Sequence, residues 1–258
     1  MQLFPVKTPI IQEKDNLIEI LINSMNKAKI KPKDGDILVV SSKVVALTQG
    51  RIINYRTIKP SKKAKALAKK YSLHPGFVEI VLKEADVIYG GVYRAVLTMK
   101  NKVFVANAGA DLSNAPEGYA ILWPKNPSLV AKKIKKEIEE KFKVKIGVII
   151  SDSHCIPLRA GTFGFALATA GFNAVIDEIG KKDLFGKRMR ITRRAVADDL
   201  ASAAQVLMGE TDWKIPAVLI RDSGVEIKNF VLDSETLMPP DECLYSSIYV
   251  EKVKKQKK

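Results

Sequence analysis

Cysteine and histidine are both scarce in this chain of 258 residues, which contains two of each. Cys155 and Cys243 are too few for a disulfide framework or for a thiolate cage around a metal ion. His74 and His154 do not supply the imidazole ligands of a typical zinc enzyme. These shortages argue against a disulfide-rich secreted domain and against a zinc site, and two reduced thiols are typical of an intracellular protein.

Long apolar runs are missing as well. No segment approaches the roughly 20 consecutive apolar residues that a membrane-spanning helix needs. Residues 1–7 have neither the charged flank nor the apolar stretch of a signal peptide. The apolar fraction of 47% is ordinary for a globular protein, and the length suits one large domain or two small ones. We therefore expect a cytoplasmic protein.

Positive charge is in excess, with a formal net charge of +15. Lysines cluster in residues 62–70, 132–145 and 252–258, and such clusters can bind nucleic acid through its phosphates. Few aromatic residues that could stack on bases lie among them. A hydrated surface that steers anionic substrates is therefore the favoured interpretation, and a nucleic-acid-binding protein is the weaker alternative.

The hydrophobic pattern predicts a mixture of helices and strands. Asn126 and Pro127 open the clearest helix, as N-cap and first helical residue. The turn at residues 100–102 and the alternation of the strand candidates around it suggest a hairpin rather than a parallel unit. Helices are expected at 61–71, from 75 and at 196–208, and strands at 37–40, 87–89, 95–98, 103–105, 146–150, 188–195 and 215–220.

Ser41 and Ser42 follow the predicted strand 37–40 and can cap a helical turn that Gly50 closes. A strand, a hydroxyl-rich turn and a helix start together direct unsatisfied N–H groups beyond the strand, where they can hold an anion. Many structural turns have the same pattern, so both interpretations remain open.

Two aspartates follow strand-forming runs, Asp111 in segment 106–114 and Asp152 after residues 147–151. A carboxylate beside hydroxyl and amide groups suits a hard divalent cation, which often arrives with nucleotide phosphates. Ser153 adds a hydroxyl of the type that binds magnesium. Alternatively, Asp111 closes a turn and Asp152 caps the next helix. Spacing alone does not prove that the two carboxylates converge.

Other polar residues have competing interpretations. Arg159, beside a glycine-rich turn, can brace a phosphate or carboxylate, or form a surface salt bridge. Glu210, after the predicted helix 196–208, can be a third oxygen ligand or an exposed loop carboxylate. Asp198, Ser202 and Gln205 form one polar stripe on that helix, for which a solvated face is the default.

The adjacent pair His154 and Cys155 could be a base and a nucleophile. Neighbouring side chains rarely have the geometry for this, and we do not expect cysteine catalysis.

Seven short segments, in the same order along the chain, together resemble the coenzyme F420-0:γ-glutamyl ligase family. The likeness extends from Phe4 to about Arg221 and so covers most of the chain. The matching segments are Asn107-Ala-Gly-Ala-Asp-Leu-Ser-Asn114, Val148-Ile-Ile-Ser-Asp-Ser153, Arg159-Ala-Gly161 with Gly164-Phe165-Ala166, Asp183-Leu-Phe-Gly186, Val196-Ala-Asp-Asp199, Leu207-Met-Gly-Glu210 and Ile215-Pro-Ala-Val218.

The resemblance implies an enzyme that joins L-glutamate to coenzyme F420-0 in an amide bond, with GTP as co-substrate and Mg²⁺ or Mn²⁺ as cofactor. An acyl phosphate formed from the acceptor carboxylate would be the intermediate. It also implies an α+β fold, with a mostly antiparallel or mixed sheet and flanking helices, in an intertwined homodimer. Residues 1–225 would form this catalytic region, and 226–258 a C-terminal extension with a lysine-rich tail.

The resemblance also implies roles for individual residues. Asp111 and Asp152 would be metal ligands and, with Arg159, catalytic residues. Ser153 would stand where the family has threonine, and Glu210 would complete a second metal site. The residues at the nucleotide would be Ser41, Ser42, Lys43, Asn114, Met208 and Gly209.

Three positions depart from the family pattern. Leu47 stands where the family has a lysine, and residues 153–156 replace a Thr-Asn-Gly-Arg segment. Residues 211–214 are bulkier than the family's glycine-rich stretch. These departures motivate a second hypothesis, a relative that binds nucleotide or ligand without turnover.

Overall fold

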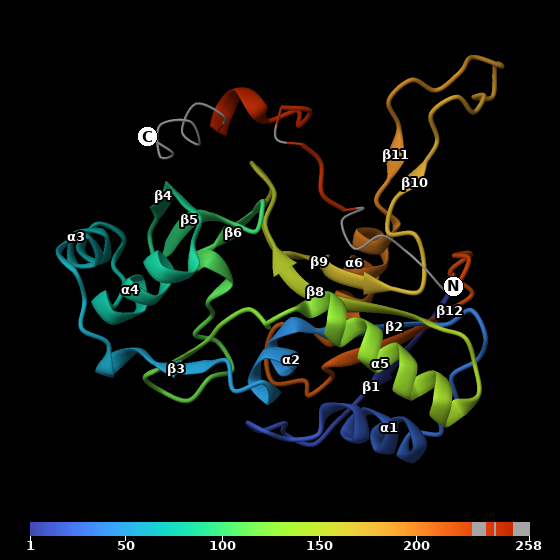
Figure 1. The fold of residues 1–258 in the computed structure, drawn as a ribbon, viewed down its shortest axis with the longest axis horizontal. Coiled ribbons are helices and arrows are strands. Elements are labelled where there is room, and N and C mark those ends of the chain that lie inside the picture. Colours follow the sequence, from blue (N-terminus) through green and yellow to red (C-terminus); the bar gives the residue numbers. More distant parts are fainter. Residues whose placement is uncertain (229–235, 240, 250–258) are drawn as a thin grey trace. The chain divides into compact units, whose positions relative to one another are not determined.

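The computed structural model describes residues 1–228, 236–239 and 241–249 (Figure 1). The chain divides into two compact units. The larger unit contains Met1–Thr48 and Lys125–Thr236, and the smaller unit contains Gln49–Pro124 and Leu237–Lys258. The predicted lysine-rich tail, residues 252–258, lies outside the described residues.

A five-stranded sheet forms the centre of the larger unit, in the order β1-β12-β2-β8-β9. Strands β2 and β8 are parallel, whereas the other neighbouring pairs are antiparallel. The prediction of a mixed sheet is thus confirmed. The strands are β1 (Gln2–Val6), β12 (Ala217–Arg221), β2 (Ile37–Ser41), β8 (Gly147–His154) and β9 (Phe163–Ala170).

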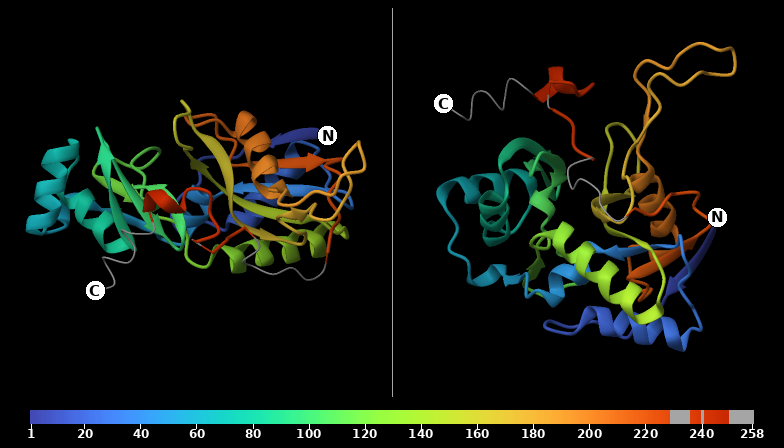
Figure 2. Two further views of the ribbon diagram at one scale, coloured as in Figure 1. Left: turned by 90° about the horizontal axis from the view of Figure 1, so that it is seen from above. Right: turned by 45° about the vertical axis from the view of Figure 1, so that its right-hand side comes forward.

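Helices cover both faces of this sheet (Figure 2, left). Helices α1 (Leu17–Lys27) and α5 (Pro127–Phe142) pack on one face, and α6 (Val196–Met208) packs on the other. Because side chains alternate along a strand, Leu38 of β2 faces α1 and α5, whereas Val39 faces α6. An apolar run without polar alternation is what such a doubly covered strand requires. The α+β class expected from the sequence is confirmed.

The N-termini of two helices differ in how they are capped. At α1, the Asn16 side chain accepts a hydrogen bond from the Glu19 N–H. At α5, Asn126 has a left-handed backbone (φ 46°, ψ 56°) and makes no capping hydrogen bond through its side chain. Asn126 thus occupies the predicted N-cap position, and its carbonyl accepts the Val130 N–H at 3.2 Å, but its side chain does not cap the helix, because side-chain capping is typical of an extended backbone. Pro127 occupies the first turn, as predicted.

An arm extends from the larger unit between β10 (Ile176–Asp177) and β11 (Arg193–Arg194), which pair antiparallel (Figure 1, yellow and orange). The predicted strand 188–195 is wrong except for β11. The alternation of apolar and polar residues there does not correspond to a buried face. Ile191, for example, is 87% exposed, so this segment has no core side chains that would hold it in a sheet.

The smaller unit contains a meander of β4 (Val87–Val92), β5 (Ala95–Lys100) and β6 (Val103–Ala106). Both pairs of neighbouring strands are antiparallel, and the pair β5 and β6 confirms the predicted hairpin at residues 100–102. Strand β3 (Ile52–Asn54) pairs separately with β7 (Tyr119–Ile121). The helical elements are α3 (Lys62–Tyr71), α4 (Pro75–Glu84) and the 3₁₀ helices η1 (Tyr55–Thr57) and η2 (Asn107–Gly109).

Phe77, Ile80 and Val81 of α4 form the core of the smaller unit with Val96 and Ala108. Over the described part of the chain, no helix has both the length and the apolar character required to span a membrane.

Candidate functional site

The serine turn at the end of β2 has the predicted geometry. Ser42 is buried and begins helix α2 (Ser42–Thr48). The Ser41 hydroxyl accepts a hydrogen bond of 3.3 Å from the Lys43 N–H. Ser41 lies opposite Ser151 in the parallel pair of β2 and β8. The serine turn and Asp152 therefore lie at the same edge of the sheet, the carboxyl edge at which α/β proteins commonly bind phosphates.

Asp152 lies within β8 and opposite Phe165 of β9, rather than beyond the strand as predicted. The strand continues to His154, because β9 pairs with this extension. The alternative role of a helix cap is wrong, since a strand follows β8. One Asp152 oxygen accepts the Ser153 N–H at 2.9 Å.

Ser153 is hydrogen-bonded to Glu210, which follows α6. Its hydroxyl donates to the Glu210 carboxylate at 2.7 Å, and Thr162 donates to the same oxygen at 3.1 Å. The Gln205 amide donates to Ser153 at 3.3 Å and also to Glu210. The structure thus brings Ser153 and Glu210 together, as expected for residues of one site.

Helix α6 is held on β9 by its polar stripe. Asp198 accepts the Ala166 N–H at 2.8 Å, and the Ser202 hydroxyl donates to the Gly164 carbonyl at 2.7 Å. Burial raises the pKa of Asp198 above its usual value. The default interpretation of a solvated face is wrong, because these polar groups satisfy main-chain atoms of the sheet.

The end of α6 carries Met208 and Gly209, the predicted nucleotide residues. Gly209 has a φ of 65° and a ψ of −177°, which is readily accessible only to glycine. A side chain at this position would also come within 2.6 Å of the Trp213 indole. Trp213 therefore lies directly against the segment that precedes Glu210.

Arg159 lies in the exposed loop between β8 and β9. Among the described residues its guanidinium forms no ion pair, so the structure gives no support to a salt bridge there. His154 lies against the rings of Phe163 and Phe165, at centroid distances of 5.6 and 5.1 Å. Burial lowers its pKa. Cys155 is exposed.

Asp111 lies in the smaller unit, just after η2. Its main chain pairs with Ile121 through two hydrogen bonds of 2.8 and 2.9 Å. Its carboxylate accepts the N–H and the hydroxyl of Ser113 at 2.8 and 2.7 Å. Asn114 follows with a φ of 53°. The carboxylate thus closes a turn, and its convergence with Asp152 and Glu210 stays a prediction.

The donor groups fit a hard divalent cation in chemical type. Asp152 and Glu210 offer carboxylates and Ser153 a hydroxyl, the oxygen ligands that Mg²⁺ and Mn²⁺ prefer. No cluster of three or more histidine, cysteine, aspartate or glutamate side chains occurs in the described ranges. Two carboxylates and hydroxyls leave coordination positions for phosphate oxygens and water, as magnesium sites with nucleotides commonly do.

Sequence reasoning missed the roles of Thr162 and Gln205 at Glu210. Gln205 had a signal, since it shares the inner stripe of α6 with Asp198 and Ser202. Thr162 had none, because only the fold of the loop before β9 brings it to Glu210.

Residues 5–222 match the family model described as F420-0:Gamma-glutamyl ligase. The chain is 39% identical over 232 residues to a coenzyme F420:L-glutamate ligase of Methanocaldococcus jannaschii, a match that covers 89% of this chain and 90% of that protein. It is 36% identical over 226 residues to the ligase of that name from Archaeoglobus fulgidus, covering 87% and 89%. A ligase of the same name from Methanopyrus kandleri is 35% identical over 217 residues, covering 84% of each chain.

Proposed function

The chain belongs to the F420-0:gamma-glutamyl ligase family, and from this premise we propose a specific reaction for it. It forms an amide bond between L-glutamate and the carboxylate of coenzyme F420-0 or a related acceptor, with GTP and a divalent metal. The observation that carries the proposal is the joining of Ser153 and Glu210 beside the serine turn of β2.

In the proposed reaction, an oxygen of the acceptor carboxylate attacks the γ-phosphorus of GTP, and GDP leaves. The amine of glutamate then attacks the carbonyl carbon of the acyl phosphate, inorganic phosphate leaves and the amine loses a proton. The chemistry depends on positioning the two substrates and on offsetting the phosphate charge. A bound divalent cation would supply part of that positive charge.

We propose that the nucleotide phosphates bind at the carboxyl edge of the larger unit's sheet. The turn Ser41–Ser42 would contact phosphate oxygens, with Lys43 as the cation of this turn. Met208 and Gly209 would contact the nucleotide from the end of α6. Gly209 suits this role because it has no side chain between the backbone and a ligand.

We assign Asp152, Ser153 and Glu210 of the larger unit, and Asp111 of the smaller unit, as metal ligands. Gln205 and Thr162 hold the Glu210 carboxylate through hydrogen bonds, and so would orient it toward a bound cation. Arg159, in the exposed loop before β9, would contact the substrate carboxylate or a phosphate. Asn114 would contact the nucleotide. We further propose that the protein acts as a homodimer in the cytoplasm.

The test is a reconstitution with F420-0, L-glutamate, GTP and MnCl₂. We expect release of inorganic phosphate that requires both acceptor and glutamate, and a product heavier by one glutamyl residue. Replacing GTP by ATP determines the nucleotide preference. Phosphate release that does not depend on glutamate would contradict amide formation.

A second candidate function is nucleotide or ligand binding without turnover. Leu47, in place of a lysine, and Trp213, packed against Gly209, favour it. Calorimetric titration with GTP and Mn²⁺ would then show binding, while the reconstitution forms no product. No binding at all by a folded sample would refute both functions.

A further inference from the structure

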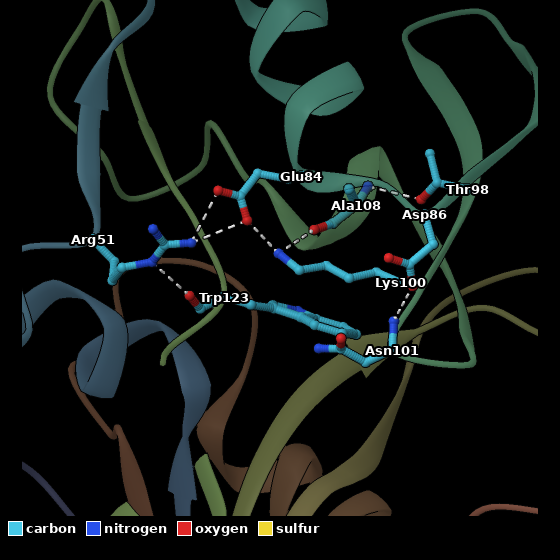
Figure 3. A network of polar contacts seen from close by, with 8 residues as sticks. All are labelled: Arg51, Glu84, Asp86, Thr98, Lys100, Asn101, Ala108 and Trp123. Atoms are coloured by element: carbon cyan, nitrogen blue, oxygen red, sulfur yellow. Dashed lines mark hydrogen bonds and ion pairs between the residues drawn. The ribbon is translucent and has the colours of Figure 1, made fainter. Parts of the chain in front are cut away.

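A rare backbone geometry precedes Asp111 and is separated from it only by Ala110. Asn107, Ala108 and Gly109 have consecutive positive φ angles of 53°, 54° and 73°. Glycine adopts this conformation freely and asparagine tolerates it, but for alanine it costs roughly 1–2 kcal/mol. Such a turn persists only where its surroundings hold it in place. The contacts around Ala108 show how this is done (Figure 3).

Thr98 of β5 binds the N–H side of the turn. Its hydroxyl accepts the Ala108 N–H at 2.9 Å and donates to the Val105 carbonyl at 2.6 Å. Thr98 and Ala108 are both fully buried, so water cannot replace this partner. The Asn107 side chain adds a third tie, because it accepts the Val96 N–H at 2.9 Å.

Lys100, two residues further along β5, binds the carbonyl of the same residue, which belongs to the next peptide, between Ala108 and Gly109. Its ammonium lies 3.4 Å from the Ala108 carbonyl and 2.5 Å from Glu84. It also lies over the Trp123 ring, 5.6 Å from the centroid. Lys100 is only 9% exposed, so this charge depends on these partners.

Arg51 and Trp123 complete the network (Figure 3). Arg51 binds both oxygens of Glu84, at 3.1 and 3.0 Å, and donates to the Trp123 carbonyl at 3.1 Å. The Trp123 indole covers Gly109 so closely that a side chain there would overlap it. The turn is thus confined by β5 and by the indole.

Stability alone is a weak reason to bury these charges. Replacing a buried ion pair by apolar side chains is often neutral or stabilising. What Thr98 and Lys100 achieve is to fix the orientation of the two peptides that flank Ala108. The chain then continues through Ala110, whose N–H donates to the Asn107 carbonyl, to Asp111, which pairs with Ile121.

We propose that Thr98 and Lys100 are positioning residues, which direct the Asp111 carboxylate by holding the left-handed turn before it. This inference rests on the proposed function, in which Asp111 is a metal ligand. Removing partners that orient a ligand typically lowers metal affinity 10–100-fold. Neither side chain touches the ligands itself, so each acts through the backbone of residues 107–111.

The test measures the Mn²⁺ dissociation constant from the paramagnetic resonance signal of free Mn²⁺, together with the thermal unfolding midpoint. Thr98→Val keeps the shape of the side chain but removes the acceptor for Ala108. Thr98→Ser keeps the hydroxyl. We expect an about tenfold weaker Mn²⁺ affinity for Thr98→Val, and wild-type affinity for Thr98→Ser.

Lys100→Met is the second variant, and Lys102→Met is its matched control. Lys102 is exposed in the turn after β5, so both variants lose the same charge, but only Lys100→Met loses the Ala108 contact. We expect weaker Mn²⁺ binding for Lys100→Met alone. If Lys100→Met does not fold, the two Thr98 variants decide.

The possible failures are distinguishable. The inference is overturned if Thr98→Val and folded Lys100→Met both keep the wild-type Mn²⁺ affinity, whatever their unfolding midpoints. The contacts around Ala108 would then serve the fold alone. Absence of Mn²⁺ binding by the wild type would overturn the proposed function, and the inference with it. Wild-type Mn²⁺ affinity in Asp111→Asn would show that Asp111 is not a metal ligand. It would therefore overturn the assignment of Asp111 and that of Thr98 and Lys100 as its positioning residues.

Discussion

The hydroxyl of Ser153 donates a hydrogen bond of 2.7 Å to the carboxylate of Glu210, although 57 positions separate the two residues. The bond joins the end of β8 to the segment after α6. Gln205 and Thr162 contact the same carboxylate oxygen, so its position is determined by three donors. In the proposed metal site, these hydrogen bonds would hold the Glu210 carboxylate in position for the cation.

The first prediction concerns this pair. Glu210→Gln should lower both Mn²⁺ affinity and kcat/KM by about 10–100-fold, because an amide is a poor ligand for a hard cation. Ser153→Thr keeps the hydroxyl and should retain activity. Glu226→Gln, an exposed site in the same unit, is the control. Equal Mn²⁺ affinities of Glu210→Gln and this control would exclude Glu210 from the metal site.

Much of the fold could be predicted, because the local signals agreed with the tertiary structure. Ser61 caps α3 through the Ala64 N–H, and α6 has its predicted bounds. Helix α1 was missed, although Asn16 and Glu19 mark its start. The arm was misinterpreted at residues 188–192, because alternation was taken for a buried face that the fold does not provide.

The site could be predicted in residue types but not in partners. Asp152 and Glu210 were candidates because carboxylates near strand and helix ends suit metals. The sequence did not show that Ser153 would reach Glu210, since this depends on how α6 packs on β9. The sequence also gave no sign that Lys100 and Thr98 would both contact Ala108. These contacts join strand β5 to the turn 107–109, and they depend on how the two segments fold against each other.

The second prediction concerns the close approach of β9 and α6. A side chain at Gly164 would overlap the Ala201 carbonyl of the helix. Gly164→Ala should therefore lower the free energy of unfolding by about 1–3 kcal/mol. It should also weaken Mn²⁺ binding, because the displaced helix carries Glu210 at its end. Urea denaturation and Mn²⁺ titration check the two effects, and wild-type values in both would contradict the packing described.

The third prediction concerns pH and the network of the smaller unit. Burial opposes ionisation of Glu84, but hydrogen bonds and charges from Lys100 and Arg51 outweigh it, so the pKa of Glu84 is lowered from its usual value. Because the folded-state pKa is lowered, this stabilisation is present above the unfolded pKa of about 4.3 and is lost as the pH falls through the folded pKa.

Glu84→Gln should consequently cost about 3 kcal/mol near pH 7, where it leaves two cations without their carboxylate. The difference from the wild type should shrink as the pH falls from about 5 toward about 3. Urea denaturation of both proteins over this range measures it. A difference that stays constant would show that ionisation of Glu84 does not contribute to stability.

The last prediction uses the two tryptophans of the chain, which have opposite environments. Trp213 is half exposed and lies against Gly209, whereas Trp123 is 4% exposed. If Met208 and Gly209 contact the nucleotide, a bound GTP lies beside the Trp213 indole and changes its polarity and its exposure to water. In Trp123→Phe, Trp213 is the sole tryptophan, and its fluorescence emission should change in a saturable way as GTP is added with Mg²⁺.

Trp213→Phe is the matched control, because it leaves only the buried Trp123, whose emission should stay constant. Calorimetric binding of GTP without a change in Trp213 emission would place the nucleotide away from the end of α6.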